Sequence, residues 1–341
     1  MTAIGLDIGG ANLKASDGTR AVSTPFPLWQ NPNGLAAALE ALLSSFSAGS
    51  PLAVTMTGEL VDCFETKEEG VRHILSAVEK VADGRQVLVW QTGGEFVSIE
   101  DAIVLIPLVA AANWHALATW AGRMCPLGRA LVFDIGSTTT DIIPIEDGLP
   151  AAQGLTDRER LATGELLYLG VRRTPLACLL GEVVVQGIRH GVARELFATT
   201  LDVHLLRGEI DEDPDCRDTA NGRLATRSAA TDRMARMICC DRDEVTAAEI
   251  QDLAACFFDR ELELVVEALR QGWPVEPPVR VLVSGAGEFL ARLALEGRGW
   301  TGGEVLSLGT LLGPELSRAA CAVALSRLAA EHLSGQRLTF F

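Results

Sequence analysis

The chain contains few aromatic side chains and no concentrated positive charge. Phe, Trp and Tyr make up 5% of its 341 residues, and tyrosine occurs once, at Tyr168. The core must therefore consist mostly of Ala, Leu, Val and Ile side chains. Acidic residues outnumber basic residues by 45 to 29, which gives a formal net charge of −16. An acidic surface repels nucleic acid and anionic membranes, and no basic run offers a footprint for a phosphate backbone.

Long apolar runs and paired cysteine motifs are absent as well. The longest apolar stretch, Ala102 to Ala112, is too short to cross a bilayer and contains Pro107. The N-terminus lacks the basic and apolar regions of a signal peptide. The eight cysteines include no Cys-x-x-Cys pair, so reduced thiols are expected; adjacent Cys239 and Cys240 are the candidate for a redox or metal site. We expect a cytoplasmic protein without nucleic-acid or membrane partners, whose oligomeric state is open.

Strands and helices are expected to alternate along the chain. At 341 residues it is longer than a single hydrophobic core usually grows, which predicts two domains. Alternating strand and helix patterns indicate an α/β fold in which helices cover parallel strands. In the first half we expect strands at 2–8, 51–56 and 86–90, and helices at 34–46 and 66–82. An alanine-rich helix should follow Pro107, with Asp101 as its cap.

The second half opens with a strand at 131–135, which leads through Gly-Ser-Thr-Thr-Thr into a strand at 141–145. Glycine and hydroxyl residues between two β-rich runs predict a tight hairpin. The pattern is irregular from 157 to 245 and includes an acidic loop, 209–218, that should face solvent. The remaining elements predicted are a strand at 279–284, a helix that begins near Glu288 and a final helix at 314–332.

One short pattern occurs twice, about once in each half of the chain. Gly5-Leu6-Asp7-Ile8-Gly9-Gly10-Ala11-Asn12 and Val132-Phe133-Asp134-Ile135-Gly136-Ser137-Thr138-Thr139 each place an apolar strand before Asp, Ile, Gly and small polar residues. Glycine lets backbone N–H groups approach phosphate oxygens closely, and hydroxyls or amides add donors. An aspartate at a strand end can hold hydrated Mg²⁺. The repeat therefore predicts a site for phosphate and magnesium.

A third motif, Leu282-Val283-Ser284-Gly285-Ala286-Gly287, takes a strand into a helix through Gly-x-Gly. Alone it carries little weight, but the two Asp-Ile-Gly hairpins followed by this turn resemble the superfamily of actin, hexokinase-type sugar kinases and ATP-dependent heat-shock chaperones. The resemblance implies two actin-like (ribonuclease-H-like) domains, 1–128 and 129–313, on either side of a cleft. It also implies that the C-terminal segment, 314–341, forms a helix that returns to the first domain.

The same resemblance assigns roles to the motif residues. The two hairpins would line opposite walls of the cleft, and the third turn would cradle adenosine. Lys14 either reaches a phosphate or is a solvated surface lysine, and Asp141 either contacts metal or hydrogen-bonds its own hairpin. The predicted metal ligands are Asp7, Asp134 and Asp141. The predicted phosphate and cofactor contacts are Gly9, Gly10, Asn12, Gly136, Ser137, Thr138, Thr139, Gly285, Ala286 and Gly287.

Further segments narrow the resemblance. They are Met56 to Phe64, Lys67, Glu69 to Val71, Ala111 to Trp114, Asp134 to Ile145, Asp157 to Leu166, Arg173 to Pro175, Phe197 to Val203 and Gly222-Arg223. Together they resemble the hydantoinase/oxoprolinase-related proteins associated with tetrahydromethanopterin-linked one-carbon transfer, over nearly the whole chain. That group includes the enzyme of methanofuran biosynthesis that joins a phenol to an aminomethylfuran.

This family resemblance implies a transferase. The archaeal member condenses γ-glutamyltyramine with an aminomethyl-furanmethanol diphosphate, which gives an aryl ether and pyrophosphate; a bacterial form, in methylofuran synthesis, could use tyrosine. Mg²⁺ on Asp7 and Asp134, the hairpin amides and Lys14 would stabilise the departing pyrophosphate. The furan ring would stabilise a carbocation at the attacked carbon. The small-molecule partners implied are thus a diphosphate donor and a phenolic acceptor.

The phenol requires a base, because its reference pKa of about 10 keeps it neutral at pH 7. Glu59, Asp62 and Glu165 are the candidates from segment resemblance, and each is alternatively a solvated or structural carboxylate. His115 is expected to be a packed core histidine. Asn113 and Trp114 either line the acceptor pocket or lock the two domains together.

Two other functions stay open at this point. The first is an ATP-dependent enzyme, a kinase or an oxoprolinase-like amidohydrolase, that uses the same cleft for ATP or ADP; Gly285 to Gly287 favours it. The second is a non-catalytic partner protein whose cleft opens and closes with a nucleotide.

Overall fold

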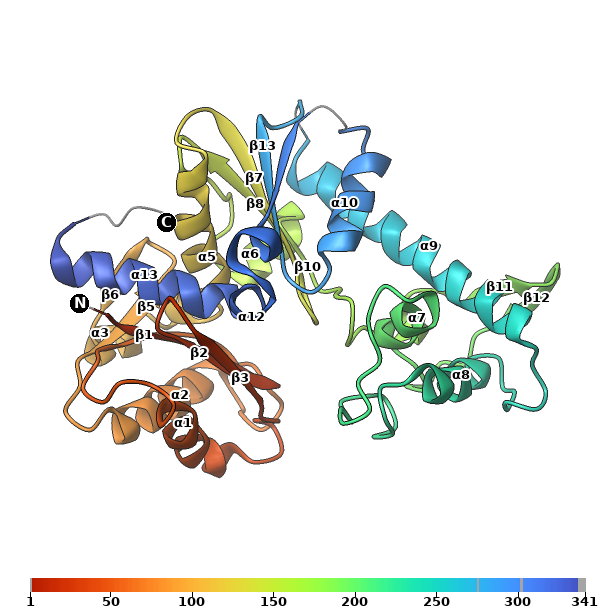
Figure 1. Cartoon of the computed structure of the whole chain (residues 1–341), viewed down its shortest axis with the longest axis horizontal. Helices are drawn as coiled ribbons and strands as arrows, with labels where there is room; N and C mark the ends of the chain where they lie inside the picture. Colours follow the sequence, from red (N-terminus) through yellow and green to blue (C-terminus); the bar gives the residue numbers. More distant parts are fainter. Residues whose placement is uncertain (1, 275, 301–302, 337–341) are drawn as a thin grey trace.

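The computed structural model describes residues 2–274, 276–300 and 303–336 and contains two large sheets (Figure 1). The first sheet has six strands in the order β3-β2-β1-β4-β5-β6. Its strands are β1 Ile4–Gly9, β2 Asn12–Ser16, β3 Ala21–Pro25, β4 Leu52–Thr57, β5 Val87–Gln91 and β6 Glu95–Val97. β1, β4 and β5 run parallel, whereas β1-β2-β3 form an antiparallel meander. The expected parallel strands are therefore present.

The second sheet repeats this plan with the order β10-β8-β7-β13-β14, and β9 extends β8. Its strands are β7 Arg129–Ile135, β8 Thr140–Glu146, β9 Leu149–Pro150, β10 Leu166–Leu167, β13 Arg280–Ser284 and β14 Glu304–Ser307. β7 and β8 form an antiparallel hairpin, as β1 and β2 do, and β7 pairs with β13 in parallel, as β1 does with β4.

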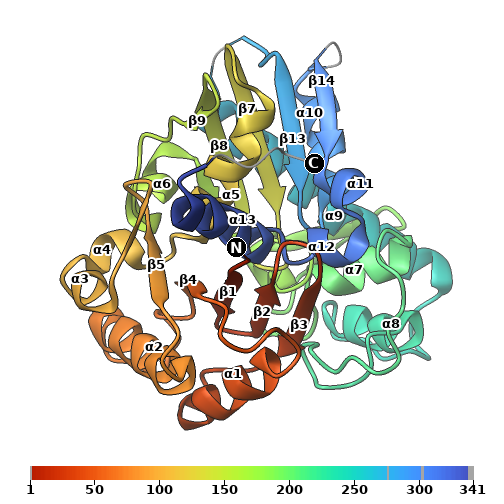
Figure 2. The same ribbon diagram turned by 60° about the vertical axis from the view of Figure 1, so that its left-hand side comes forward.

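Helices cover both sheets (Figure 2). The helices of the first half are α1 Leu35–Leu43, α2 Lys67–Ala82, α3 Ile99–Val104, α4 Ile106–Val109 and α5 Asn113–Ala121. Those of the second half are α6 Asp157–Thr163, α7 Thr200–Arg207, α8 Arg227–Arg236, α9 Ala247–Gly272, α10 Glu288–Gly297, α11 Leu308–Leu312, α12 Pro314–Ser317 and α13 Ala320–Ser334. α1 and α2 pack on the outer face of the first sheet, while α9 and α10 pack on that of the second.

Helices α5 and α13 lie between the two sheets and share one hydrophobic core with both. That core joins apolar side chains of β4 and β5 to those of β7, β8 and β13. α13 packs directly on β1. The Ser326 hydroxyl donates to the carbonyl of Ala3, the residue before β1, at 2.7 Å. The C-terminal helix therefore contacts the first strand, although most of the sequence separates the two.

The segment between β10 and β13 forms a lobe that projects beside the second sheet (Figure 1). It contains a small sheet of β11 Glu182–Val185 and β12 Ile188–Gly191, the helices α7 and α8, and part of the long α9. A fully buried ion pair, Arg233 to Asp202 at 2.6 Å, links α8 to α7. Buried charges of this kind are tolerated only when they are paired. The acidic loop 209–218 lies here and is largely exposed, as expected.

The α/β class, the two hairpins and most of the predicted elements are confirmed, and two expectations were wrong. Asp101 does not cap the alanine-rich helix: Ser98 caps α3 by accepting from the Asp101 N–H, and α5 begins only at Asn113. The final helix is split into α12 and α13, with its break at 318–319. No strand was predicted at β14, because its four residues are too few to show an alternation of apolar and polar side chains. In the described part of the chain no helix is long and apolar enough to span a membrane.

We predict that Gly5→Ala destabilises the protein through the contact between β1 and α13. A Cβ atom at this position would lie 2.0 Å from the Ala322 carbonyl oxygen, a backbone atom that cannot rotate away. The free energy of unfolding should fall by about 3 kcal/mol, as overpacked cores do. Urea unfolding followed by circular dichroism measures it. Gly181→Ala is the control, because its Cβ meets nothing within 4 Å; equal stability of the two variants would contradict the prediction.

Candidate active site

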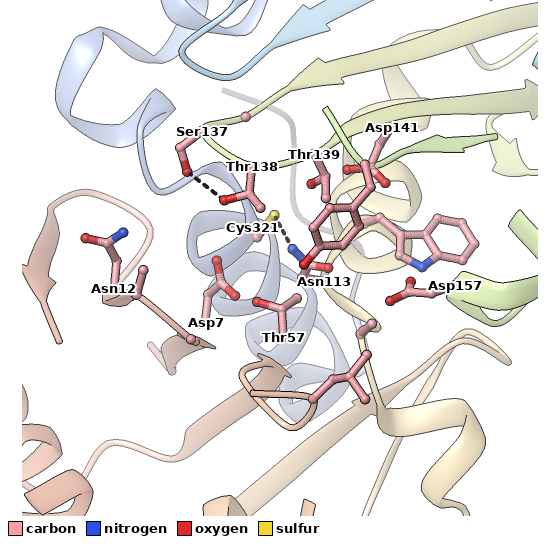
Figure 3. A pocket seen from close by; sticks show the side chains of 18 of the residues that line it. Asp7, Asn12, Thr57, Asn113, Ser137, Thr138, Thr139, Asp141, Asp157 and Cys321 are labelled. Atoms are coloured by element: carbon pink, nitrogen blue, oxygen red, sulfur yellow. Dashed lines mark hydrogen bonds between the residues drawn. The ribbon is translucent and has the colours of Figure 1, made fainter. Parts of the chain in front are cut away.

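A cavity of about 330 Å³ lies where the two hairpins face each other. Figure 3 shows Asp7, Asn12 and Thr57 on its first-sheet side, Ser137, Thr138 and Thr139 on its second-sheet side, and Asn113 and Cys321 from α5 and α13 between them. Of the residues predicted from the sequence, those that line the cavity are Asp7, Gly9, Gly10, Asn12, Lys14, Glu59, Asp134, Gly136, Ser137, Thr138, Thr139 and Asp141. The structure therefore brings both hairpins to one site.

The two hairpins place different partners opposite their aspartates. In the first, Asp7 on β1 faces Lys14 on β2, and the lysine Nζ lies 3.9 Å from Asp7 Oδ2. In the second, Asp134 on β7 faces Asp141 on β8. Like charges directly opposite each other on a sheet are unfavourable. Burial and the neighbouring Asp141 accordingly raise the pKa of Asp134 to about 6.

Each hairpin turn is held from behind by backbone hydrogen bonds. The Gly10 carbonyl accepts from the Leu28 N–H at 2.9 Å, and the Gly136 carbonyl accepts from the Val171 N–H at 3.1 Å. Gly170 packs so closely on the second turn that a Cβ there would lie 2.5 Å from the Thr138 nitrogen. Because these carbonyls accept hydrogen bonds from neighbouring segments, the backbone of both turns is held in one conformation. A turn held in this way suits a preorganised anion site.

Asp7 is suited to hold a metal ion together with a ligand's phosphate. It is buried, and its Oδ1 has no hydrogen-bond partner within the described residues, although Lys14 approaches Oδ2. Burial raises the pKa of Asp7, and the Lys14 ammonium opposes that shift. In the described ranges, no three His, Cys, Asp or Glu side chains cluster closely enough to hold a metal by themselves. Two carboxylates completed by phosphate and water are what Mg²⁺ accepts.

Asp141 is engaged by a buried arginine. The Arg160 guanidinium donates to Asp141 Oδ1 at 2.9 Å and lies 3.9 Å from the centre of the Trp114 ring. Burial raises the pKa of Asp141, and Arg160 counteracts it. The partner of Asp141 is thus an arginine of α6, which neither sequence-based alternative named, and the Trp114 ring packs against that arginine. The metal role of Asp141 stays a prediction.

Among the three candidate bases, Glu59 has the most suitable position. It is only 1% exposed, it lines the cavity, and its Oε2 is unpaired within the described part. Burial raises its pKa to about 7. Glu165 is buried elsewhere: it accepts from the Gln153 and Gly154 N–H groups and from a threonine hydroxyl, which is a structural arrangement. Asp62 is exposed and does not line the cavity.

The glycines of the third motif serve a packing contact. Gly285 has a φ of +88°, and a Cβ there would lie 2.2 Å from the Ile135 carbonyl oxygen. The Gly287 N–H donates to that same carbonyl at 2.8 Å. Gly285, Ala286 and Gly287 are not among the residues that line the cavity. Their adenosine role stays a prediction, since packing already accounts for both glycines.

Several lining residues were given no role from the sequence. They are Trp29, Thr57, Leu60, Val61, Ala111, Asp157, Arg160, Leu166, Tyr168, Arg173 and Cys321. Asp157, Arg160 and Arg173 lie within segments that carried the family resemblance, which was the available signal. Arg173 lies over the Trp29 ring at 5.3 Å and pairs with Asp218 at 3.3 Å, so it connects the first sheet's side of the mouth to the lobe.

His115 and the cysteines were also considered from the sequence, and the redox or metal role of Cys239 and Cys240 stays a prediction. His115 is buried between Trp90 and Trp114, and burial lowers its pKa to about 4, so it is a neutral core residue. All eight cysteines are free. Cys321 lies in the cavity wall, where burial raises its pKa well above the ordinary value; it is therefore a thiol and not a nucleophilic thiolate.

Comparison with known proteins agrees with this architecture. The sequence profile described as hydantoinase/oxoprolinase matches residues 52–331. The chain belongs to the hydantoinase/oxoprolinase family. It is 32% identical over 338 residues to the (4-{4-[2-(gamma-L-glutamylamino)ethyl]phenoxymethyl}furan-2-yl)methanamine synthase of Methanocaldococcus jannaschii, which covers 97% of this chain and 98% of that protein. The synthase of the same name from Methanococcus vannielii is 34% identical over 167 residues, 49% of this chain and 75% of that protein.

Two solved structures resemble this hydantoinase/oxoprolinase family member. The nucleotide-free acetone carboxylase superposes with a TM-score of 0.50 and 14% identity, over 89% of this chain and 46% of that one. A ROK family glucokinase from Streptomyces griseus, in complex with glucose and AMPPNP, has a TM-score of 0.49 and 15% identity, over 97% and 100% of the two chains. The chain itself has two sheets that each contain one of the two Asp-Ile-Gly hairpins, as the sequence predicted.

We predict that Arg160→Met destabilises the fold because it leaves Asp141 as an uncompensated buried charge. Breaking one partner of a buried ion pair costs about 3–5 kcal/mol. Adding Asp141→Asn should recover part of the loss, because the two side chains interact directly. Denaturant unfolding of the single and double variants measures this coupling. Arg158→Met, at an exposed position of the same helix, is the control; additive losses would contradict the prediction.

Proposed function

We propose that the protein is a transferase that forms an aryl ether between a phenol and an aminomethyl-furanmethanol diphosphate, with release of pyrophosphate. The observation that carries this proposal is a single cavity that joins two phosphate-type turns to Glu59, a buried carboxylate with an unpaired oxygen. The 32% identity to the M. jannaschii synthase, over 97% of this chain, supports the same reaction class. The product belongs to methanofuran-type cofactors of one-carbon metabolism.

The diphosphate would bind between the two hairpin turns. The backbone N–H groups of the turns and the hydroxyls of Ser137 and Thr138 are donors of the kind that phosphate oxygens accept. The carboxylates of Asp7 and Asp134 would repel a diphosphate on their own, so a cation must accompany it. Mg²⁺ fits this donor set and, when bound, would offset the charge that develops on the departing pyrophosphate. Lys14 adds a fixed positive charge beside Asp7.

Glu59 would take the proton of the attacking phenol. A general base works best when its pKa lies near the operating pH, and burial brings the pKa of Glu59 to about 7. Carbon–oxygen bond breaking releases pyrophosphate, the phenol oxygen forms the new bond to the furan methylene carbon, and the phenolic proton passes to Glu59. Use of the same cleft for ATP remains the second candidate, for which the late Gly-x-Gly turn is the only specific support.

Purified protein with Mg²⁺, γ-glutamyltyramine or tyrosine, and the aminomethyl-furan diphosphate should give the aryl ether and pyrophosphate. Mass spectrometry detects both products. Asp7→Asn and Asp134→Asn should abolish the reaction, because each removes a carboxylate beside the diphosphate, and chelation of Mg²⁺ should do the same. A parallel reaction with ATP alone tests the second candidate: turnover of ATP without ether product would overturn the proposal.

The rate of ether formation should depend on the ionisation of Glu59. Because a base acts in its deprotonated form and kcat/KM reports the free enzyme, kcat/KM should fall as the pH drops through about 7. Glu59→Gln should lower kcat by about 10²–10⁴-fold and remove this acidic limb. Steady-state pyrophosphate release from pH 5.5 to 9 measures both effects. Asp62→Asn, an exposed carboxylate in the same loop, should retain the wild-type profile; an unchanged profile in Glu59→Gln would assign the base elsewhere.

A further inference from the structure

We infer that Asp157, together with Glu59 and Tyr168, forms a subsite that binds the primary ammonium group of the furan donor. This ammonium subsite rests on the proposed function, because it identifies how that donor is oriented. All three side chains line the cavity. The relatives' product is a furanyl methanamine, whose amine is cationic at neutral pH as the lysine amine is.

Asp157 lacks the partners that other charged residues of the cavity have. It is half-buried in the first turn of α6 and makes no hydrogen bond or ion pair with its side chain in the described ranges. Arg160, one turn along, is committed to Asp141, and Arg173 is committed to Asp218. Burial raises the pKa of Asp157, which Lys67 only partly offsets. Its carboxylate is therefore available to a cation from outside the protein.

Glu59 provides a second and independent indication of a missing cation. Its Oε2 is buried without a partner although it lines the cavity. Burial raises the pKa of Glu59, the Lys67 ammonium opposes that shift and Asp157 adds to it. A buried carboxylate near a half-buried one is costly without a fully compensating charge. An ammonium ion on Asp157 would supply that charge and would favour the ionised form of Glu59. Donor binding would thereby prepare the base.

Tyr168 completes the subsite as an exposed aromatic ring. It is the only tyrosine of the chain, and 65% of its surface is accessible although it lies at the cavity. Burial and then Asp157 raise the pKa of its hydroxyl, while Arg173 opposes the shift. Asp157 and Glu59 line the same cavity as this ring. An accessible tyrosine beside carboxylates is a common environment for an organic cation.

The ammonium subsite and the phosphate turns occupy different ends of the cavity. Figure 3 shows Asn12 and Ser137 at one side of the pocket and Asp157 with Asp141 at the other. A donor with a diphosphate at one end and an ammonium group at the other would therefore bind in one direction only. Its reacting methylene carbon would face the position between the turns and Glu59. Because the two ends of the donor carry opposite charges, their recognition determines the orientation of the donor without a large apolar contact.

The test compares the aminomethyl donor with an analogue that carries methyl in place of aminomethyl. Wild-type protein should prefer the amine donor by about 10- to 100-fold in kcat/KM, the range expected for a charged hydrogen bond. Asp157→Asn should raise KM for the amine donor by a similar factor, leave KM for the phenol unchanged, and use the two donors equally well. Asp62→Asn should behave as wild type. An equal loss with both donors, or a raised KM for the phenol instead, would overturn the inference.

A binding measurement separates this inference from the proposed reaction. Furfurylamine and the neutral 2-methylfuran can be titrated into wild-type and Asp157→Asn protein at millimolar concentration and followed by ligand-observed NMR. Tighter binding of furfurylamine to the wild type, lost in Asp157→Asn, supports the ammonium subsite even if no ether forms in any assay. Equal binding of furfurylamine to both proteins would reject it even if the ether synthase activity is established.

Discussion

The packing of α5 and α13 between the two sheets is the constraint on which the site depends. Each sheet alone would expose an apolar face, and these two helices bury both faces in one shared core. Gly5 allows α13 to approach β1 at backbone distance, so the first hairpin is held against the helix that also supplies Cys321 to the cavity wall. The separation between Asp7 and Asp134 is thus set by helix packing and not by the hairpins themselves.

Within this frame, two similar hairpins provide two electrostatically different walls. The residue opposite the aspartate is a lysine in the first hairpin and a second aspartate in the second. The second wall therefore needs an arginine, and Arg160 reaches it by lying over Trp114 on α5. The repeated pattern gives both walls a turn that suits phosphate, while a single residue opposite each aspartate gives the two walls different charges.

The sequence was informative where short, repeated patterns specify backbone geometry. Both Asp-Ile-Gly hairpins and the α/β class could be predicted, because glycine and alternating apolar residues determine local structure. The approach of the hairpins to one cleft was implied by the superfamily resemblance. The roles of Asp157 and Tyr168 could not be predicted, since nothing in the spacing reveals which carboxylates lack a partner. Glu59 and Glu165 show the difficulty, because both are buried acids in segments that carry the family resemblance. Only the structure shows that Glu59 has an unpaired oxygen, whereas Glu165 accepts hydrogen bonds from the loop at Gln153 and Gly154. The domain boundaries at 128 and 313 remain predictions.

The place of α13 also has a consequence for how the chain is made. β1 (Ile4–Gly9) is synthesised long before α13 (Ala320–Ser334), the helix that covers one of its faces. Contacts between such distant segments form late and slow the final folding step. Until α13 has been synthesised, that apolar face of the first sheet stays exposed. Exposed apolar surface of this kind makes nascent chains aggregate or bind chaperones. Completion of the cleft therefore waits for the synthesis of α13.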